Sequence, residues 1–240
     1  MGNNQDTNNA KVAVITGCNR GLGCGIAVQL LENDYVVVGL NRTATEDKRL
    51  KYQPRYVEYI CDITRPDEIE RSLKHIQNVK LLVCNAGIRR FGAIEELSEK
   101  DWLNSVETNL NGVFYTVKCA LPQVKESKGD IIIIGSHSEK YTFETGSAYC
   151  STKGALKEFS ECLMEEVRYD NVRVSYLSLG SIKNRDHGTD ESWKLLPEQV
   201  GDTVVSLAKL PKNVLVPYMD VRPAKPLKNM LSGIEKLQYV

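Results

Sequence analysis

The chain has 240 residues, of which 42% are hydrophobic and 26% charged, and its 31 basic side chains balance its 31 acidic ones. A net charge of zero without a basic block argues against nucleic acid as a partner. No apolar run approaches the length of a membrane span, so no membrane partner is expected. The seven cysteines include no Cys-x-x-Cys pair, which argues against a disulfide framework and a metal site. With no secretory signal at its start, the protein is expected to be cytoplasmic.

From Lys11 onward, short apolar runs alternate with helical patterns. The runs predict strands at 12–15, 35–38, 56–60, 81–83, 131–134, 172–179 and 214–216. The helical patterns predict helices at 22–33, 67–76, 98–124, 147–168 and 197–210, the third of them bent or ended near Pro122. Such alternation is typical of a parallel sheet covered by helices on both faces. We therefore predict one doubly wound α/β domain, a Rossmann fold of about seven strands, over residues 11–240 behind a polar disordered tail, residues 1–10.

A glycine-rich turn, Thr16-Gly17-Cys18-Asn19-Arg20-Gly21-Leu22-Gly23, separates the first predicted strand from the first predicted helix. In doubly wound folds this turn lets the backbone approach a pyrophosphate, and the helix N-terminus supplies partial positive charge. The alternative is a glycine-rich connection without a ligand. The position directly after the first strand favours the dinucleotide site.

The end of the second predicted strand bears on the choice of cofactor. An acidic residue there would bind the ribose hydroxyls of NAD, but the stretch contains Asn41 and Arg42 and no carboxylate. Arg42, together with Arg20 in the turn, would suit a 2′-phosphate. Arg42 could instead be a solvated loop residue. The two arginines together favour NADP(H) over NAD(H).

Tyr149 and Lys153 lie one helical turn apart in the segment Tyr149-Cys150-Ser151-Thr152-Lys153. A phenol with a pKa near 10 is a poor base at neutral pH, and an ammonium on the same helix face favours its ionised form. The spacing alone is weak evidence, because unrelated chains contain it by chance. Its meaning depends on the rest of the sequence.

Six spaced motifs together resemble the short-chain dehydrogenase/reductase family, and they cover nearly the whole chain in the family's order. They are Thr16–Gly23, Cys61-Asp62-Ile63, Cys84-Asn85-Ala86-Gly87, Asn109-Leu110-Asn111-Gly112, Ser136 thirteen residues before Tyr149, and the Tyr149/Lys153 pair. Three positions depart from the family's pattern, where Cys84 replaces an asparagine, Leu179 a proline and Asn184 a threonine. None of these changes removes a reacting group, but each bears on the pose of the cofactor.

The resemblance implies a catalytic set of Asn109, Ser136, Tyr149 and Lys153. Ser136 and Tyr149 would hydrogen-bond a substrate carbonyl, and Tyr149 would transfer the proton. Lys153 would favour the phenolate and hold the nicotinamide ribose, and Asn109 would hold a water that relays protons to it. The implied cofactor-binding residues are Gly17, Asn19, Arg20, Gly21, Leu22, Gly23, Asn41, Arg42, Asp62, Ile63, Asn85, Ala86, Gly87, Tyr149, Lys153, Gly180 and Ile182.

Substrate recognition is expected from three loops beyond the strand ends, Arg89–Phe91, Glu139–Gly146 and a substrate loop near 180–196. The last of these is polar, which favours a small polar substrate. A histidine beside a serine, as in His137 and Ser136, also occurs in hydrolase triads, but no Gly-x-Ser-x-Gly elbow frames this serine. We interpret His137 as a loop residue.

The leading hypothesis is an NADP(H)-dependent carbonyl reductase or alcohol dehydrogenase acting on a small molecule. An alternative is a sensor or scaffold that binds NADP without turnover, although such a protein needs none of the catalytic set. A dehydratase or epimerase of the same fold is usually longer. The family resemblance further implies a homodimer or homotetramer, formed through the long helix and the helix that carries Tyr149.

Overall fold

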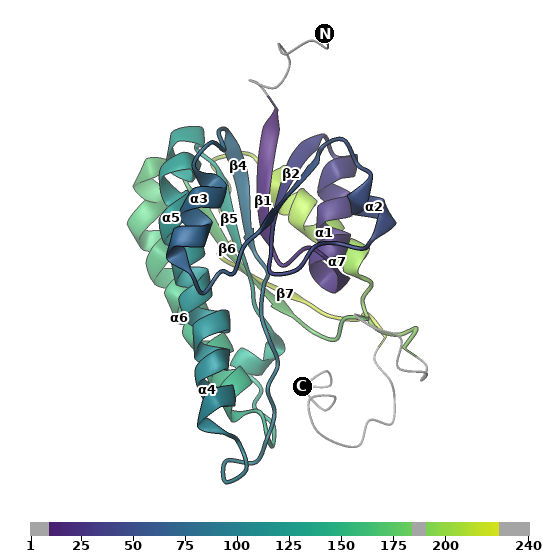
Figure 1. The fold of residues 1–240 in the computed structure, drawn as a ribbon, viewed down its shortest axis with the longest axis vertical. Helices are drawn as coiled ribbons and strands as arrows, with labels where there is room; N and C mark the ends of the chain where they lie inside the picture. The colour runs from purple at the N-terminus through teal and green to yellow at the C-terminus, as the bar shows by residue number, and fades with distance from the viewer. Residues whose placement is uncertain (1–9, 184–190, 226–240) are drawn as a thin grey trace.

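A single parallel sheet organises the molecule, which a computed structural model describes over residues 10–183 and 191–225 (Figure 1). Its strands are β1 (Lys11–Thr16), β2 (Tyr35–Asn41), β3 (Tyr56–Ile60), β4 (Val79–Cys84), β5 (Asp130–Ile134), β6 (Arg173–Leu179) and β7 (Tyr218–Val221). They lie in the order β3-β2-β1-β4-β5-β6-β7, and every neighbouring pair is parallel. The predicted α/β fold is confirmed.

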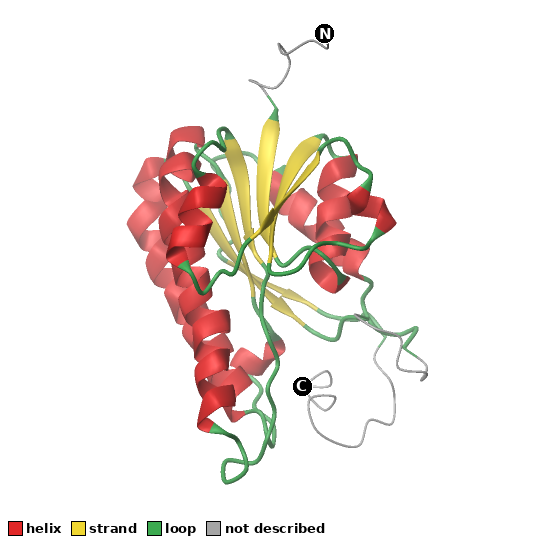
Figure 2. Cartoon of the chain, in the orientation of Figure 1, coloured by secondary structure: helices red, strands yellow, loops and turns green. Residues whose placement is uncertain are grey.

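Helices cover both faces of the sheet (Figure 2). They are α1 (Gly21–Glu32), α2 (Lys48–Lys51), α3 (Pro66–Leu73), α4 (Glu99–Val106), α5 (Gly112–Ser127), α6 (Ser147–Val167) and α7 (Pro197–Ala208), with short segments η2 (Glu107–Asn111), η3 (His137–Glu139) and η4 (Arg168–Asp170). Residues of α3, α5 and α6 share one buried apolar cluster, and residues of α1 and α7 share the other. Successive β1 residues alternate between them, with Val14 in the first and Ala13 and Ile15 in the second. This alternation explains why the strand reads as a continuous apolar run.

Two sequence predictions about element bounds are wrong. The last strand is β7 at Tyr218–Val221 rather than 214–216. Val214 is 38% exposed, and its N–H donates to the Pro211 carbonyl within a turn. The pairing with β6 begins only after Pro217, at Tyr218. An edge strand that is only half buried carries no continuous apolar run. The prediction therefore chose the more apolar residues 214–216, which come before the strand itself.

The long helix is interrupted at a different place from the one predicted. Pro122 lies inside α5, which continues to Ser127. The departure from α-helical geometry occurs earlier, where Glu107–Asn111 form a π-helical segment between α4 and α5. Such segments insert one residue into the helical ladder and often occur at functional sites.

Within residues 10–183 and 191–225, no helix is long and apolar enough to cross a membrane, and no group of three potential metal ligands occurs. Two predicted segments lie largely outside the described residues. They are residues 1–9 of the predicted tail 1–10, and residues 184–190 of the expected substrate loop, which include Asn184.

Candidate active site

The glycine-rich turn is tied closely to the loop that follows β4. Gly17 has φ +67°, and a Cβ there would lie 3.0 Å from the Cα of Ala86. Thr16 Oγ1 accepts hydrogen bonds from the N–H groups of Asn85 and Ala86, both at 3.0 Å, and Asn85 Nδ2 donates to the Gly17 carbonyl at 2.9 Å. Two motifs that lie far apart in the sequence, Thr16–Gly23 and Asn85–Gly87, therefore form one surface.

The N-terminus of α1 opens onto this turn. The N-cap residue Arg20 is exposed and makes no side-chain cap, and the first turn, Gly21-Leu22-Gly23, contains no acidic residue. The positive end of a helix that lacks a capping side chain is suited to an anion. Asn19 Nδ2 joins the turn to the loop after β2 through the Thr43 carbonyl (3.1 Å) and Thr43 Oγ1 (2.9 Å).

Asn41 supports the turn from within the protein. Its side chain is fully buried, and Oδ1 accepts hydrogen bonds from the N–H groups of Cys18 (2.7 Å) and Asn19 (3.2 Å). Its Nδ2 donates to Glu58 Oε1 at 2.6 Å. Asn41 therefore shapes the expected cofactor site without exposing its own amide, whereas Arg42 beside it is exposed.

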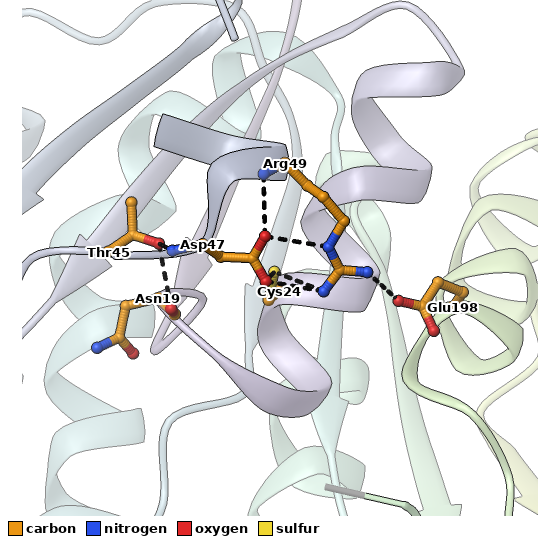
Figure 3. A network of polar contacts seen from close by, with 6 residues as sticks. All are labelled: Asn19, Cys24, Thr45, Asp47, Arg49 and Glu198. Carbon is orange, nitrogen blue, oxygen red and sulfur yellow. Dashed lines mark hydrogen bonds and ion pairs between the residues drawn. The ribbon is translucent and has the colours of Figure 1, made fainter. Parts of the chain in front are cut away.

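Figure 3 shows a polar network that continues this support toward α7. Thr45 Oγ1 donates to the Asn19 carbonyl at 3.1 Å and accepts from the Asp47 N–H at 3.3 Å. The Asp47 carboxylate pairs with Arg49, which also binds Glu198. Hydrogen bonds from Arg49 outweigh the effect of burial and hold the pKa of Asp47 well below its usual range. Asp47 is thus already engaged within the protein, as is Glu58.

In the acidic motif after β3, Asp62 stabilises a turn and Ile63 packs into the core. Asp62 Oδ1 accepts from both the N–H and the hydroxyl of Thr64, each at 2.9 Å. The Ile63 side chain is 6% exposed, and its Cδ1 would lie 2.7 Å from a Cβ on Gly112. Ile63 therefore packs against the start of α5, and only its backbone remains for a cofactor contact.

The expected catalytic side chains converge at the C-terminal end of β5. Tyr149 and Lys153 lie on α6 and are 6% exposed each, while Ser136 is the N-cap of η3. Lys153 Nζ donates to the Ile134 carbonyl at 2.8 Å and lies 5.9 Å from the centre of the Tyr149 ring. The Ser136 side chain lies close enough to Tyr149 to lower the pKa of its phenol. Three of the four expected catalytic residues therefore lie together.

The charges around Tyr149 favour its ionised form. Burial raises the pKa of the phenol, but the charges of Lys153 and Arg89, with hydrogen bonds from Ser136 and Arg89, bring the pKa below its ordinary value of 10. Burial also lowers the pKa of Lys153 below 10.5, against the opposing effect of the Tyr149 phenol. The surroundings of Tyr149 therefore favour loss of the proton from the phenol oxygen.

Asn109, the fourth residue, lies in the π-helical segment and is 1% exposed. Its Oδ1 accepts from the Ile88 N–H at 2.7 Å, and its Nδ2 donates to the Ile88 carbonyl at 2.9 Å and to Thr152 Oγ1 at 3.2 Å. Thr152 lies between Tyr149 and Lys153 on α6 and donates to the Tyr149 carbonyl at 2.8 Å. Asn109 thus connects the loop after β4 to the helix of Tyr149.

Two residues near Ser136 have more structure than the sequence suggested. His137 is not in an open loop: it lies in η3, is 4% exposed, and its Nε2 is 2.7 Å from Asp220 Oδ1. Glu139 forms a capping box with Ser136 and accepts from the Ser136 N–H at 3.2 Å. The Glu139 carboxylate also accepts hydrogen bonds from three hydroxyls, those of Tyr176, Ser178 and Tyr218.

The segment after β6 closes one side of the site. The Gly180 N–H donates to the Val221 carbonyl at 2.9 Å, and Ile182 forms a bridge with Leu195. A Cβ on Gly180 would lie 3.2 Å from the His137 ring. Gly180 therefore borders η3, which begins after Ser136, and Ile182 lies two residues further along the same segment.

A cavity of about 350 Å³ lies between the loop after β4 and the segment from η3 to the start of α6. Apolar groups of Ile94 and Phe143 line it together with hydroxyls of Ser138 and Ser147. The oxygens of both serines are buried and have no hydrogen-bond partner within the described part of the chain. One wall comes from Glu139–Gly146, one of the three loops expected to recognise substrate, and the other from Gly92 and Ile94, just after the expected loop Arg89–Phe91.

Comparison with known proteins agrees with this geometry. Residues 11–194 match the sequence model of the short chain dehydrogenase family. The chain belongs to this family. It is 30% identical to an uncharacterized oxidoreductase of Staphylococcus saprophyticus over 229 residues, which is 89% of this chain and 97% of that protein. It is 34% identical to a 3-oxoacyl-[acyl-carrier-protein] reductase of Buchnera aphidicola over 184 residues, 72% of this chain and 74% of the relative.

Among solved structures, the chain resembles an alcohol dehydrogenase from Thermococcus sibiricus complexed with 5-hydroxy-NADP. The TM-score is 0.80 at 29% identity, with 89% of this chain and 97% of the other covered. The protein is therefore an oxidoreductase of the short-chain dehydrogenase family. Its positive-φ glycine turn and the uncapped start of α1 fit a nicotinamide dinucleotide.

Sequence reasoning missed the individual roles of three residues, Arg89, Thr152 and Glu139. The loop that contains Arg89 was expected to recognise substrate, but the contact of the Arg89 side chain with Tyr149 was not predicted. Glu139 follows Ser136 at the spacing of a capping box, a signal that could have been recognised. Thr152 carries no sequence signal, because its partner Asn109 lies in another helix.

Proposed function

We propose that the protein is an NADP(H)-dependent oxidoreductase that interconverts a carbonyl and a secondary alcohol on a small polar substrate. The observation that carries this proposal is the Tyr149 phenol, buried against Ser136 and Lys153 with a pKa below its ordinary value. A phenol whose pKa is lowered can donate a proton in its neutral form and accept one in its ionised form.

In the direction of reduction, Ser136 and Tyr149 hydrogen-bond the carbonyl oxygen and polarise it. Bound NADPH would supply the hydride that the carbonyl carbon receives. Tyr149 donates its proton to the oxygen, and Lys153 stabilises the phenolate that remains. Asn109 holds Ile88 and Thr152 in place, so that α6 and the loop after β4 keep their spacing. Reprotonation of Tyr149 through Lys153 and a water near Asn109 is part of this proposal.

The preference for NADP(H) over NAD(H) rests on charge at the end of β2. Arg20 and Arg42 are exposed beside the turn, and two guanidiniums can bind a phosphate through charge-assisted hydrogen bonds. The nearby carboxylates of Asp47 and Glu58 are engaged by Arg49 and Asn41. Neither is free to accept the ribose hydroxyls that NAD would present. The other proposed cofactor contacts are those of the turn, of Asp62 to Ile63, of Asn85 to Gly87, and of Gly180 and Ile182.

The cavity supports a small polar substrate, because hydroxyl groups interrupt its apolar walls. Self-association is also part of the proposal. Phe114 on α5 is 44% exposed, and its ring lies 6.3 Å from that of Phe159 on α6. Apolar rings shared by these two helices would suit a homodimer or homotetramer in the cytoplasm.

The test follows NADPH absorbance with a panel of polar and apolar ketones and aldehydes, for the parent and for Tyr149→Phe. Tyr169→Phe is the control, because Tyr169 is 88% exposed on η4. Turnover should fall at least about 100-fold in Tyr149→Phe, the usual scale of lost acid catalysis, and persist in the control. Tight NADPH binding without turnover of any carbonyl would favour the alternative, a sensor or scaffold that binds the nucleotide. Equal turnover by all three proteins would refute the role of Tyr149.

A further inference from the structure

Arg89 places a positive charge next to the reacting group that we propose. It lies in the loop between β4 and α4, two residues after Gly87, and its side chain is exposed. Its guanidinium carbon lies 5.9 Å from the centre of the Tyr149 ring, and its charge helps to lower the pKa of the phenol.

This guanidinium has no acidic partner in the described chain. The next residue, Arg90, pairs with Asp101 at 3.0 Å, whereas no carboxylate among residues 10–183 and 191–225 lies within ion-pair distance of Arg89. The carboxylate of Glu139 accepts three hydroxyls and the Ser136 N–H. An unpaired guanidinium beside a buried phenol is therefore available to an anionic group of the substrate.

We propose that Arg89 binds a carboxylate of the substrate, and that the substrates are short oxo acids and the corresponding hydroxy acids. This inference rests on the proposed function, because it takes the carbonyl oxygen to lie against Tyr149.

The distances define which acids fit. A carbonyl oxygen that hydrogen-bonds the phenol lies about 3 Å from the phenol oxygen. The Arg89 guanidinium carbon lies 5.9 Å from the centre of the same ring, so this side chain reaches the space beside that carbonyl. A carboxylate on the carbonyl carbon, or one carbon further along, falls within that reach. A planar guanidinium can bind such a carboxylate through two parallel hydrogen bonds, which a neutral ester cannot match.

Aromatic side chains limit the size of the remaining group. The Phe91 ring packs edge to face against Tyr149 at 5.9 Å and against Phe143 at 5.4 Å. Phe143 also lines the cavity. The phenol therefore has a cation on one side and an apolar wall on the other, an arrangement that suits a short acid with a small apolar end.

The experiment compares 2-oxobutanoate and 3-oxobutanoate with their methyl esters, using the parent, Arg89→Gln and the control Arg90→Gln. The parent should prefer the free acids. Arg89→Gln should lower kcat/KM for an acid about 10- to 100-fold, chiefly through KM, the scale of a lost hydrogen bond to a charged group. Turnover of the esters should fall by a smaller factor, through the effect on the phenol alone, so that the ratio of kcat/KM for acid over ester falls about 10-fold or more in Arg89→Gln. Arg90→Gln should resemble the parent.

An equal loss for acids and esters would overturn the proposal, because Arg89 would then act only on the phenol. A parent that reduces neutral ketones but prefers esters would overturn it while leaving the proposed function intact. Calorimetric titration of 3-hydroxybutanoate into the NADP⁺-loaded parent and Arg89→Gln tests the site without turnover. Binding lost in the variant supports the carboxylate site, and absence of binding to the parent refutes it, whatever the outcome for Tyr149→Phe.

Discussion

The amide of Asn109 permits a sharp test of how the site is held together. Asn109→Asp keeps the shape of the side chain and the acceptor for the Ile88 N–H, but it removes the donor to the Ile88 carbonyl and to Thr152. Two lost hydrogen bonds cost about 1 kcal/mol each, and a buried carbonyl left without a donor adds about 1–2 kcal/mol. The side chain is 1% exposed, so solvent cannot replace them. We therefore expect the free energy of unfolding to fall by about 3–4 kcal/mol at pH 7.

This loss should depend on pH in a defined direction. A buried carboxyl among acceptors has a folded-state pKa above its unfolded value near 4, and only its protonated form can donate to the Ile88 carbonyl. The stability contributed by that form is present below the unfolded pKa and is lost as pH rises through the folded pKa. The difference from the parent should therefore be small near pH 4 and largest at pH 7.

The assay is urea unfolding of parent and variant, followed by circular dichroism at both pH values. Asn104→Asp, an exposed change one turn before the π-helical segment, is the control and should shift stability by less than about 0.5 kcal/mol. Equal stability of Asn109→Asp and the parent at pH 7, or a loss that is greater at pH 4, would refute the reasoning.

Three other substitutions test separate parts of the account. Arg42→Ala should weaken NADPH binding about 10- to 100-fold in a fluorescence titration and leave NADH binding unchanged, and equal losses for both would contradict the phosphate contact. Arg173→Met leaves Asp130, 6% exposed, with Lys212 at 2.9 Å in place of two partners, because the Arg173 pair at 2.7 Å is lost. Urea unfolding should therefore show a loss at the lower end of the range for a broken buried pair, about 3 kcal/mol, and less than about 1 kcal/mol would argue against the pair. Phe114→Glu should reduce the assembly to smaller species in sedimentation velocity, and an unchanged sedimentation coefficient would exclude this face as the interface.

The sequence predicts the sheet well because its inner strands are buried on both faces. Continuous apolar runs such as Ile131–Ile134 can be interpreted without knowledge of their neighbours. β7 lies at the edge of the sheet and alternates exposed Tyr218 and Asp220 with half-buried Met219, so the apolar run at 214–216 was chosen in its place. The error reflects burial on one face only.

The candidate site was predicted where short motifs occur at strand ends. Ser136, Tyr149 and Lys153 come together because parallel strands and their following helices meet at one edge of the sheet. The contact of Arg89 with Tyr149 and the hydroxyls around Glu139 could not be predicted in the same way. Their partners come from other elements, so that only the packed fold defines these contacts.

The most direct test of the central claim is the pH dependence of alcohol oxidation with NADP⁺, measured on the short hydroxy acid or neutral secondary alcohol that the parent turns over fastest. In this direction Tyr149 must accept a proton, so the rate depends on the fraction of phenolate. The lowered pKa of Tyr149 predicts a rate that rises with pH through a midpoint below pH 10, with activity lost in Tyr149→Phe. A rate independent of pH, or the same profile in Tyr149→Phe, would contradict the assignment of Tyr149 as the acid and base.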